Sequence, residues 1–182
     1  MPRRREHSPY QLPLELGRPA HEPTSVYRAL LENLATPQET SRFVRVVPEE
    51  VVVRSTADVA AHLLRRIFTP LEQLDQEELW VLLFSTRQRL THEVLLYRGT
   101  LDSVPIRPAE AFKEAVRVNA AAILLAHNHP SGDPAPSSQD VQLTEVVGQA
   151  GRLLSIPLLD HLVIGHGRWV SLREQGLALK GR

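Results

Sequence analysis

One stretch of the chain, in which a buried-strand pattern ends in two histidines and leads into a capped helix, constrains its folding most. Ala120–Ala126 is a short apolar run, and His127-Asn128-His129 follows it directly. Alternate side chains of an extended segment point to the same side, so both imidazoles should face one way. A turn rich in proline and glycine then leads to Ser137, a typical N-cap, with Asp140 three residues later. The stretch therefore predicts a strand, a turn and a helix that bring two imidazoles and a carboxylate together.

The residue types of this stretch are those of a metal site. Two histidines and one carboxylate, with a fourth position left open for water, are a usual ligand set of a catalytic zinc ion. We therefore predict that His127, His129 and Asp140 bind one Zn²⁺ per chain. Iron, cobalt and manganese accept the same ligands, so metal availability decides as much as affinity does.

Two other interpretations of these residues stay open at this point. Histidines next to proline and glycine are often polar residues of a surface turn with no ligand role. Ser137 and Asp140 also have the spacing of a capping box, in which the acid at the third helical position accepts a hydrogen bond from the cap amide. The box explains Asp140 but leaves both histidines unexplained.

The order and spacing of these residues resemble a known family. The pattern H-x-H-x7-S-x2-D is the signature of the JAMM (JAB1/MPN/Mov34) metalloprotease fold. The form H-N-H-P-S-G-D-P-x-P-S-x-x-D, with the later L-L-D-H-L-V-I-G and V-S-L-R-E-x-G, closely resembles the bacterial RadC family. The resemblance runs from about Ser55 to about Gly176 and includes Gly99-Thr100-Leu101 and the segment from Pro108 to Ala126. It implies a metal-dependent hydrolase.

The resemblance also implies a glutamate that acts as general base on a zinc-bound water and lies just before the first core strand. Family members commonly place this acid one residue ahead of an aromatic or aliphatic residue and the strand, which selects Glu77 as the catalytic base. Glu78 points to the other side of an extended chain and is the alternative. Glu93 is a third candidate that matches no family acid.

Three further residues match the family or adjoin such a match. Ser137 resembles the serine whose hydroxyl steadies the oxyanion, and its N-cap role is compatible with that function. His161 lies in an apolar strand pattern, so we expect a hydrogen-bonded core residue or a support for a ligand, which Asp160 could orient. Asn128 completes an H-N-H string that is coincidental with respect to the HNH nucleases. Three other histidines belong to no motif, and we predict that they lie on the surface: His62, His92 and His166.

Periodicity predicts alternating helices and strands from Ser55 onward. The expected helices are residues 56–68, 108–118 and 138–154, and the expected strands are 79–84, 93–97, 120–126, 158–164 and 168–171. Strands mixed with helices indicate an α/β fold, which we expect to be a three-layer sandwich around a central mixed sheet. The family resemblance implies that this sandwich has the JAMM fold, which is similar to that of cytidine deaminases. We assign residues 55–182 to this domain and residues 1–54 to a partly irregular N-terminal arm. Within the arm we expect a short helix at Val26–Leu34 and short strands at Phe43–Val47 and Val51–Val53.

Composition excludes several classes of protein. A formal net charge of zero gives no field that favours nucleic acid, membranes or acidic substrates. The absence of cysteine excludes disulfides, cysteine-ligated zinc and the zinc-dependent nucleobase deaminases, whose signature needs two thiolates. No apolar run is long enough to span a membrane, and none follows the N-terminal arginines as in a secretory signal. We therefore expect a cytoplasmic protein with no membrane partner. The sequence does not indicate its oligomeric state.

The leading hypothesis is a zinc-dependent metallohydrolase that cleaves peptide or isopeptide bonds in a peptide or protein substrate. The alternative is a non-proteolytic protein associated with DNA repair, for which the RadC family is traditionally named. RadC proteins usually carry a helical N-terminal region that resembles a helix-hairpin-helix DNA-binding module. The glycine hairpins of such a module are missing from residues 1–50, and Arg65-Arg66 is more simply solvated charge.

Overall fold

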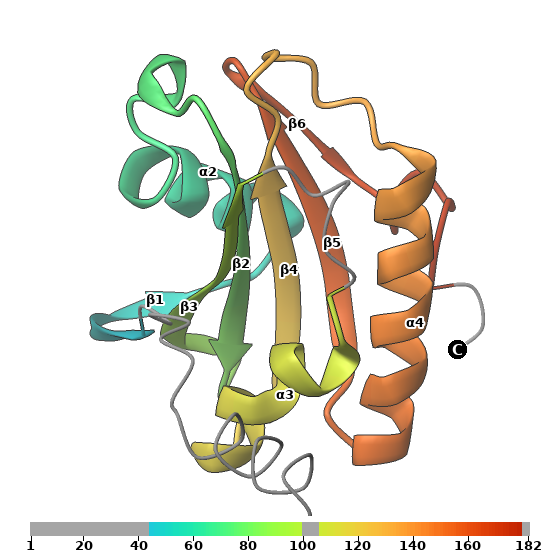
Figure 1. Ribbon diagram of the computed structural model, residues 1–182. Coiled ribbons are helices and arrows are strands. Elements are labelled where there is room, and N and C mark those ends of the chain that lie inside the picture. Colours follow the sequence, from blue (N-terminus) through green and yellow to red (C-terminus); the bar gives the residue numbers. More distant parts are fainter. Residues whose placement is uncertain (1–43, 100–105, 180–182) are drawn as a thin grey trace, which may run out of the picture. The chain divides into compact units, whose positions relative to one another are not determined.

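The computed structural model describes residues 44–99 and 106–179, shown as coloured ribbon in Figure 1. Six strands within these residues form one sheet in the order β1-β3-β2-β4-β5-β6. The strands are β1 (Val44–Val52), β2 (Glu77–Phe84), β3 (Arg89–Gly99), β4 (Ala122–Asn128), β5 (Leu158–Gly165) and β6 (Arg168–Ser171). The helices are α2 (Thr56–Arg66), α3 (Pro108–Arg117) and α4 (Ser138–Leu154), with a 3-10 turn, η1, at Leu71–Gln73. The helix expected at Val26–Leu34 lies outside the described residues.

The sheet is mixed, as the sequence predicts. Strands β4 and β5 run parallel, whereas the other neighbouring pairs among the described strands are antiparallel. A parallel pair needs a crossover connection, and α4 supplies it between the end of β4 and the start of β5. The carboxyl end of β4 and the amino end of α4 are therefore joined by one short segment. The predicted metal-binding residues lie in this segment and in the adjoining ends of β4 and α4.

Two apolar cores, one on each face of the sheet, confirm the three-layer sandwich (Figure 1). Successive side chains of β2 alternate between them: Leu82 packs in the core that includes α2, and Leu83 packs in the core that includes α3 and α4. The central strands β2 and β4 are buried on both faces, which explains why they read as unbroken apolar runs.

Element boundaries differ from the sequence expectation in ways that matter at two places. Strand β2 begins at Glu77 rather than Leu79, because residues 77–79 pair with the end of β3. The two strands expected around Pro48 form one strand, β1, whose pairing with β3 shifts register between Val46 and Val51. This strand belongs to the sheet, although the sequence pattern places it in the N-terminal arm. None of the helices in the described residues is both long and apolar enough to cross a membrane.

Candidate metal centre

Side chains from β4 and α4 meet at the carboxyl end of β4. His127 is the penultimate residue of the strand, and His129 follows its last residue. Their Nε2 atoms are 3.0 Å apart, and the His127 Nε2 atom is 3.2 Å from Asp140 Oδ1. The His129 Nε2 atom is 3.7 Å from Asp140 Oδ2. The three side chains thus offer ligand atoms that all lie within 4.8 Å of one another, as a single metal ion requires.

The group is buried on one side and accessible on the other. His127 is fully buried and Asp140 is nearly so, whereas His129 is partly exposed. His129 and Asp140 line a cavity of about 360 Å³, together with Glu77 and Ser137. A catalytic metal ion needs such an open side, because water or substrate must occupy its remaining coordination position.

Asp140 takes part in the capping box and in the histidine group at once. As the third residue of α4, it accepts hydrogen bonds at Oδ2 from the Ser137 amide and from the Ser137 hydroxyl, each 2.7 Å long. Its other oxygen, Oδ1, faces His127. The capping interpretation and the ligand interpretation are therefore compatible, because they use different oxygens of one carboxylate.

The electrostatic balance keeps this carboxylate ionised. Burial raises the pKa of Asp140, but the close approach of His127 and His129 outweighs it and holds that pKa well below its usual range. The nearby carboxylate of Asp140 in turn raises the pKa of His129 despite its burial. An ionised carboxylate beside two imidazoles has the charge expected of a site for a divalent cation.

The backbone fixes the tautomer of His129. Its Nδ1 atom lies 2.8 Å from the carbonyl oxygen of Asp133, which can only accept a hydrogen bond. Nδ1 must therefore carry the proton, and the Nε2 lone pair of the neutral ring is left for a ligand. Metal-binding histidines commonly have their ring orientation set in this way.

A chain of three side chains fixes the tautomer of His127. The Thr144 hydroxyl donates its one hydrogen to the Asp140 carbonyl oxygen at 2.5 Å, so it accepts from His161 Nδ1 at 2.6 Å. The other nitrogen of His161, Nε2, then accepts from His127 Nδ1 at 2.9 Å. Burial lowers the pKa of His161 to about 3, which keeps that ring neutral. The Nε2 lone pair of His127 is therefore directed away from this chain, toward Asp140.

Thr144 is the residue that orients His161, and reasoning from the sequence missed it. Asp160, expected in that role, instead accepts hydrogen bonds from the His161 backbone amide at 2.7 Å and from the Ser171 hydroxyl at 2.6 Å. The available signal was helical spacing, because Thr144 lies four residues after Asp140 and so occupies the same face of α4.

The two adjacent glutamates point in different directions. Glu78 is buried, and its carboxylate accepts a hydrogen bond from Trp80 Nε1 at 2.9 Å and pairs with Arg98 at 2.7 Å. Glu77 is half-buried and lines the metal-site cavity. The geometry thus favours Glu77 over Glu78 for chemistry at this site, and its role as the base stays a prediction.

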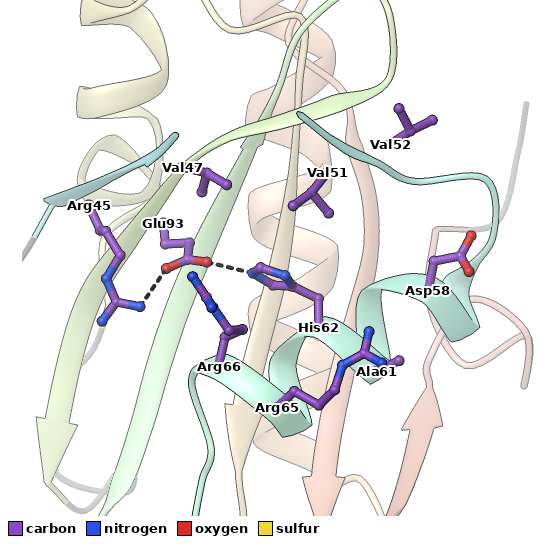
Figure 2. Close-up of a pocket in the computed structure, with 10 residues that line it drawn as sticks. All are labelled: Arg45, Val47, Val51, Val52, Asp58, Ala61, His62, Arg65, Arg66 and Glu93. Carbon is purple, nitrogen blue, oxygen red and sulfur yellow. Dashed lines mark hydrogen bonds and ion pairs between the residues drawn. The ribbon is translucent and has the colours of Figure 1, made fainter. Parts of the chain in front are cut away.

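Glu93 belongs to a different cluster, shown in Figure 2. Its Oε1 atom is 2.5 Å from His62 Nε2, and its Oε2 atom is 3.0 Å from Arg45 Nη1. These residues line a separate cavity of about 440 Å³ between α2 and β1, to which Arg65 and Arg66 also contribute. Glu93 is absent from the lining of the metal-site cavity.

The surface prediction for His62 was wrong, because its pairing with Glu93 makes burial of the imidazole favourable. The other two histidines of that prediction differ in exposure: His166 is exposed and His92 is half-buried. The His166 ring nevertheless covers the loop between the ligands, because a Cβ at Gly132 would lie 2.4 Å from its Nδ1 atom. Gly132 has φ +80°, a backbone conformation that glycine adopts readily.

A three-layer α/β sandwich that carries a His-His-Asp group at the end of a central strand defines a JAB-type domain with a candidate metal site. The family model of the RadC-like JAB domain matches residues 53–177. The chain belongs to this family, which confirms the resemblance seen in the sequence.

Curated relatives support the same assignment. The chain is 48% identical over 134 residues to a UPF0758 protein of Chloroflexus aurantiacus, an alignment that covers 74% of this chain and 57% of the relative. It is 47% identical over 130 residues to a UPF0758 protein of Roseiflexus castenholzii, covering 71% and 54%. A UPF0758 protein of a Geobacillus strain is 38% identical over 125 residues, covering 69% and 54%. The chain thus spans little more than half the length of these relatives.

Proposed function

We propose that this chain is a zinc-dependent hydrolase that cleaves peptide or isopeptide bonds. The observation that carries the proposal is the convergence of His127 Nε2, His129 Nε2 and the Asp140 carboxylate beside a cavity that Glu77 also lines. The donor set fits zinc, because the Nδ1 atoms of both imidazoles have other hydrogen-bond partners, their Nε2 atoms face the shared point, and the carboxylate is ionised. A zinc ion held there would supply Lewis acidity and lower the pKa of a coordinated water toward ~7.

Glu77 would move the proton in this reaction. A carboxylate at the cavity wall can take a proton from the attacking water and then deliver it to the leaving amine. Its neighbour Glu78 cannot do both, because its two oxygens already pair with Trp80 and Arg98 on the other side of β2. Adjacent glutamates therefore have different roles, because consecutive side chains of a strand point to opposite faces of the sheet.

Ser137 would serve the site in two ways. Its hydroxyl donates to Asp140 Oδ2, which holds the carboxylate against the two imidazoles. Ser137 also lines the cavity, so the same hydroxyl can turn toward an oxyanion that forms beside the metal ligands. We therefore assign to Ser137 the positioning of Asp140 and assistance to the oxyanion.

The decisive experiment compares Glu77→Gln with Glu78→Gln in the full chain loaded with Zn²⁺. Hydrolysis is measured on a library of fluorogenic peptides and on lysine-linked isopeptides, and zinc content is measured by elemental analysis. We expect Glu77→Gln to retain zinc and to lose ~100-fold or more in rate, the usual contribution of a general base. Glu78→Gln should stay within a few fold of the parent chain.

Loss of activity in Glu78→Gln but not in Glu77→Gln would overturn the assignment of the base. A parent chain that binds no zinc, or binds it and cleaves no substrate of either class, would count against the hydrolase itself. The described residues add no support to a DNA-associated role, which stays the alternative hypothesis. Equal DNA affinity of the parent chain and His129→Ala, with no hydrolysis by either, would favour it.

A further inference from the structure

Asn128, between the two histidines, makes contacts that the proposed chemistry does not yet use. Its side chain is fully buried and alternates with those of His127 and His129 along the strand. The Oδ1 atom accepts a hydrogen bond from the Glu78 amide at 2.7 Å. The Nδ2 atom donates to the Gln76 carbonyl oxygen at 3.1 Å. These two backbone groups flank Glu77.

The contacts replace sheet pairing at a place where it stops. The pairs between β2 and β4 run from Phe84 opposite Ala122 to Leu79 opposite His127. Residues 76–78 lie beyond the last of these pairs. A side-chain amide has one acceptor and a donor, the two groups that a neighbouring strand would offer to the backbone on either side of a residue. Asn128 therefore extends the connection between β2 and β4 past the end of the ladder.

We propose that Asn128 is a positioning residue that sets the place of Glu77 relative to the metal ligands. This inference rests on the proposed function, because it takes Glu77 as the base. Three consecutive residues at the end of β4 and just after it then determine the geometry of the reaction: the outer two hold the metal and the middle one holds the backbone of the base. A shift of about 1 Å in a reacting group can cost ~100-fold in rate, so such a connection affects catalysis directly.

Contacts within β2 and with β3 also act on Glu77 and on the residue after it. The Glu78 side chain is held by Trp80 and Arg98, and the backbone of Glu77 pairs with Gly99 of β3. The bond from Asn128 to the Gln76 carbonyl oxygen acts on the residue before the base. Leucine at position 128 would have the same branching as asparagine but would leave the buried Glu78 amide and the Gln76 carbonyl oxygen without this partner, which is costly for the buried amide.

The inference is tested with Asn128→Ala and Asn128→Leu, in the parent background and in Glu77→Gln. The matched control is Thr91→Val, which removes a different side-chain hydrogen bond to β2, from Thr91 Oγ1 to the Leu83 carbonyl oxygen at 3.0 Å. In the parent background, we expect both Asn128 variants to keep the zinc content of the parent chain and to lose ~10–100-fold in kcat, with little change in KM. In the Glu77→Gln background, the Asn128 changes should add almost nothing, because the group they position is gone.

A second readout needs no substrate. Cobalt(II) replaces zinc, and the visible spectrum is titrated with pH to find the midpoint of ionisation of the coordinated water. A nearby carboxylate disfavours that ionisation, so Glu77→Gln should lower the midpoint by about one unit. The Asn128 variants should lower it by part of that shift, and Thr91→Val should not change it. Asn128→Leu keeps the core filled and replaces the alanine variant should that one fail to fold.

The outcomes separate the two proposals. A cobalt midpoint and a kcat that stay at the parent values in both Asn128 variants, while Glu77→Gln changes them, overturn the role of Asn128 alone. A Glu77→Gln variant that matches the parent in both measurements overturns the role of Glu77, and with it the inference about Asn128. Equal losses from the Asn128 changes with and without Glu77 would indicate a general structural effect and would also overturn it.

Discussion

Helices α2 and α4 begin with the same local motif, and only one of the two motifs faces a candidate metal site. Ser55 caps α2 and Ser137 caps α4, and in each case an aspartate at the third helical position completes a capping box. Asp58 accepts from the amides of Arg54 and Ser55 at 2.9 and 3.0 Å and is exposed. Asp140 makes the corresponding bond to the Ser137 amide but is buried.

The surroundings of the two boxes make the difference. Asp140 faces two imidazoles at the end of β4, whereas Asp58 uses one oxygen, Oδ2, to accept from both amides at its own cap. One helical turn later the contrast repeats. Thr144 supports a histidine that supports a ligand, whereas His62 pairs with Glu93 in a cluster that Arg45 completes. A capping box thus indicates where a helix begins, and the facing strand decides whether its acid can also bind a metal ion.

The largest difference between the two capping boxes is expected when the charge of each aspartate is removed. Asp140→Asn should lower zinc affinity by more than the ~10–100-fold typical of residues that support a ligand, because it removes a charged ligand. Asp58→Asn should leave zinc affinity unchanged. Competition with a chromogenic chelator measures both. Equal zinc binding by the two variants would mean that Asp140 is a capping residue only.

A smaller effect is expected one turn further along each helix. Thr144→Val removes the hydroxyl that orients His161, so the tautomer of His127 is no longer fixed, and zinc affinity should fall about tenfold. The counterpart His62→Gln changes the Glu93 cluster and should not affect zinc affinity. The same chelator competition applies. A His62→Gln variant that loses zinc as strongly as Thr144→Val would contradict the separation of the two clusters.

The smallest effect concerns acid stability. Hydrogen bonds from the Arg54 backbone and from Ser55 lower the pKa of Asp58 in the folded state. A lowered folded-state pKa contributes stability that is present above the unfolded-state pKa of about 3.9 and is lost as pH falls below it. Asp58→Asn lacks this contribution, so it should unfold with a lower free energy than the parent chain at about pH 6. This difference between parent and variant should be smaller at about pH 3. Urea unfolding at both pH values measures it, and a constant deficit would contradict the assignment.

The sequence predicts secondary structure and short-range motifs, but it does not predict side-chain contacts that depend on which strands are neighbours in the sheet. The strand, turn and helix around His127 and Asp140 follow from alternation, turn residues and a cap within fourteen positions. The contacts of Asn128 reach back 50 and 52 positions, and His62 meets Glu93 across 31. Such contacts require the order of the strands in the sheet, which periodicity does not encode. The family pattern selects Glu77 from its position ahead of the strand, and alternation along β2 gives the physical reason.

The parallel step from β4 through α4 to β5 has a consequence for how relatives of this chain can diverge. It places the two histidines at the carboxyl end of β4, after the residues of that strand that fill the two apolar cores. A descendant that exchanged both histidines for other polar residues would keep those cores and hence the architecture. Loss of the chemistry is thereby uncoupled from loss of the fold, so inactive descendants could persist as stable scaffolds and acquire new duties.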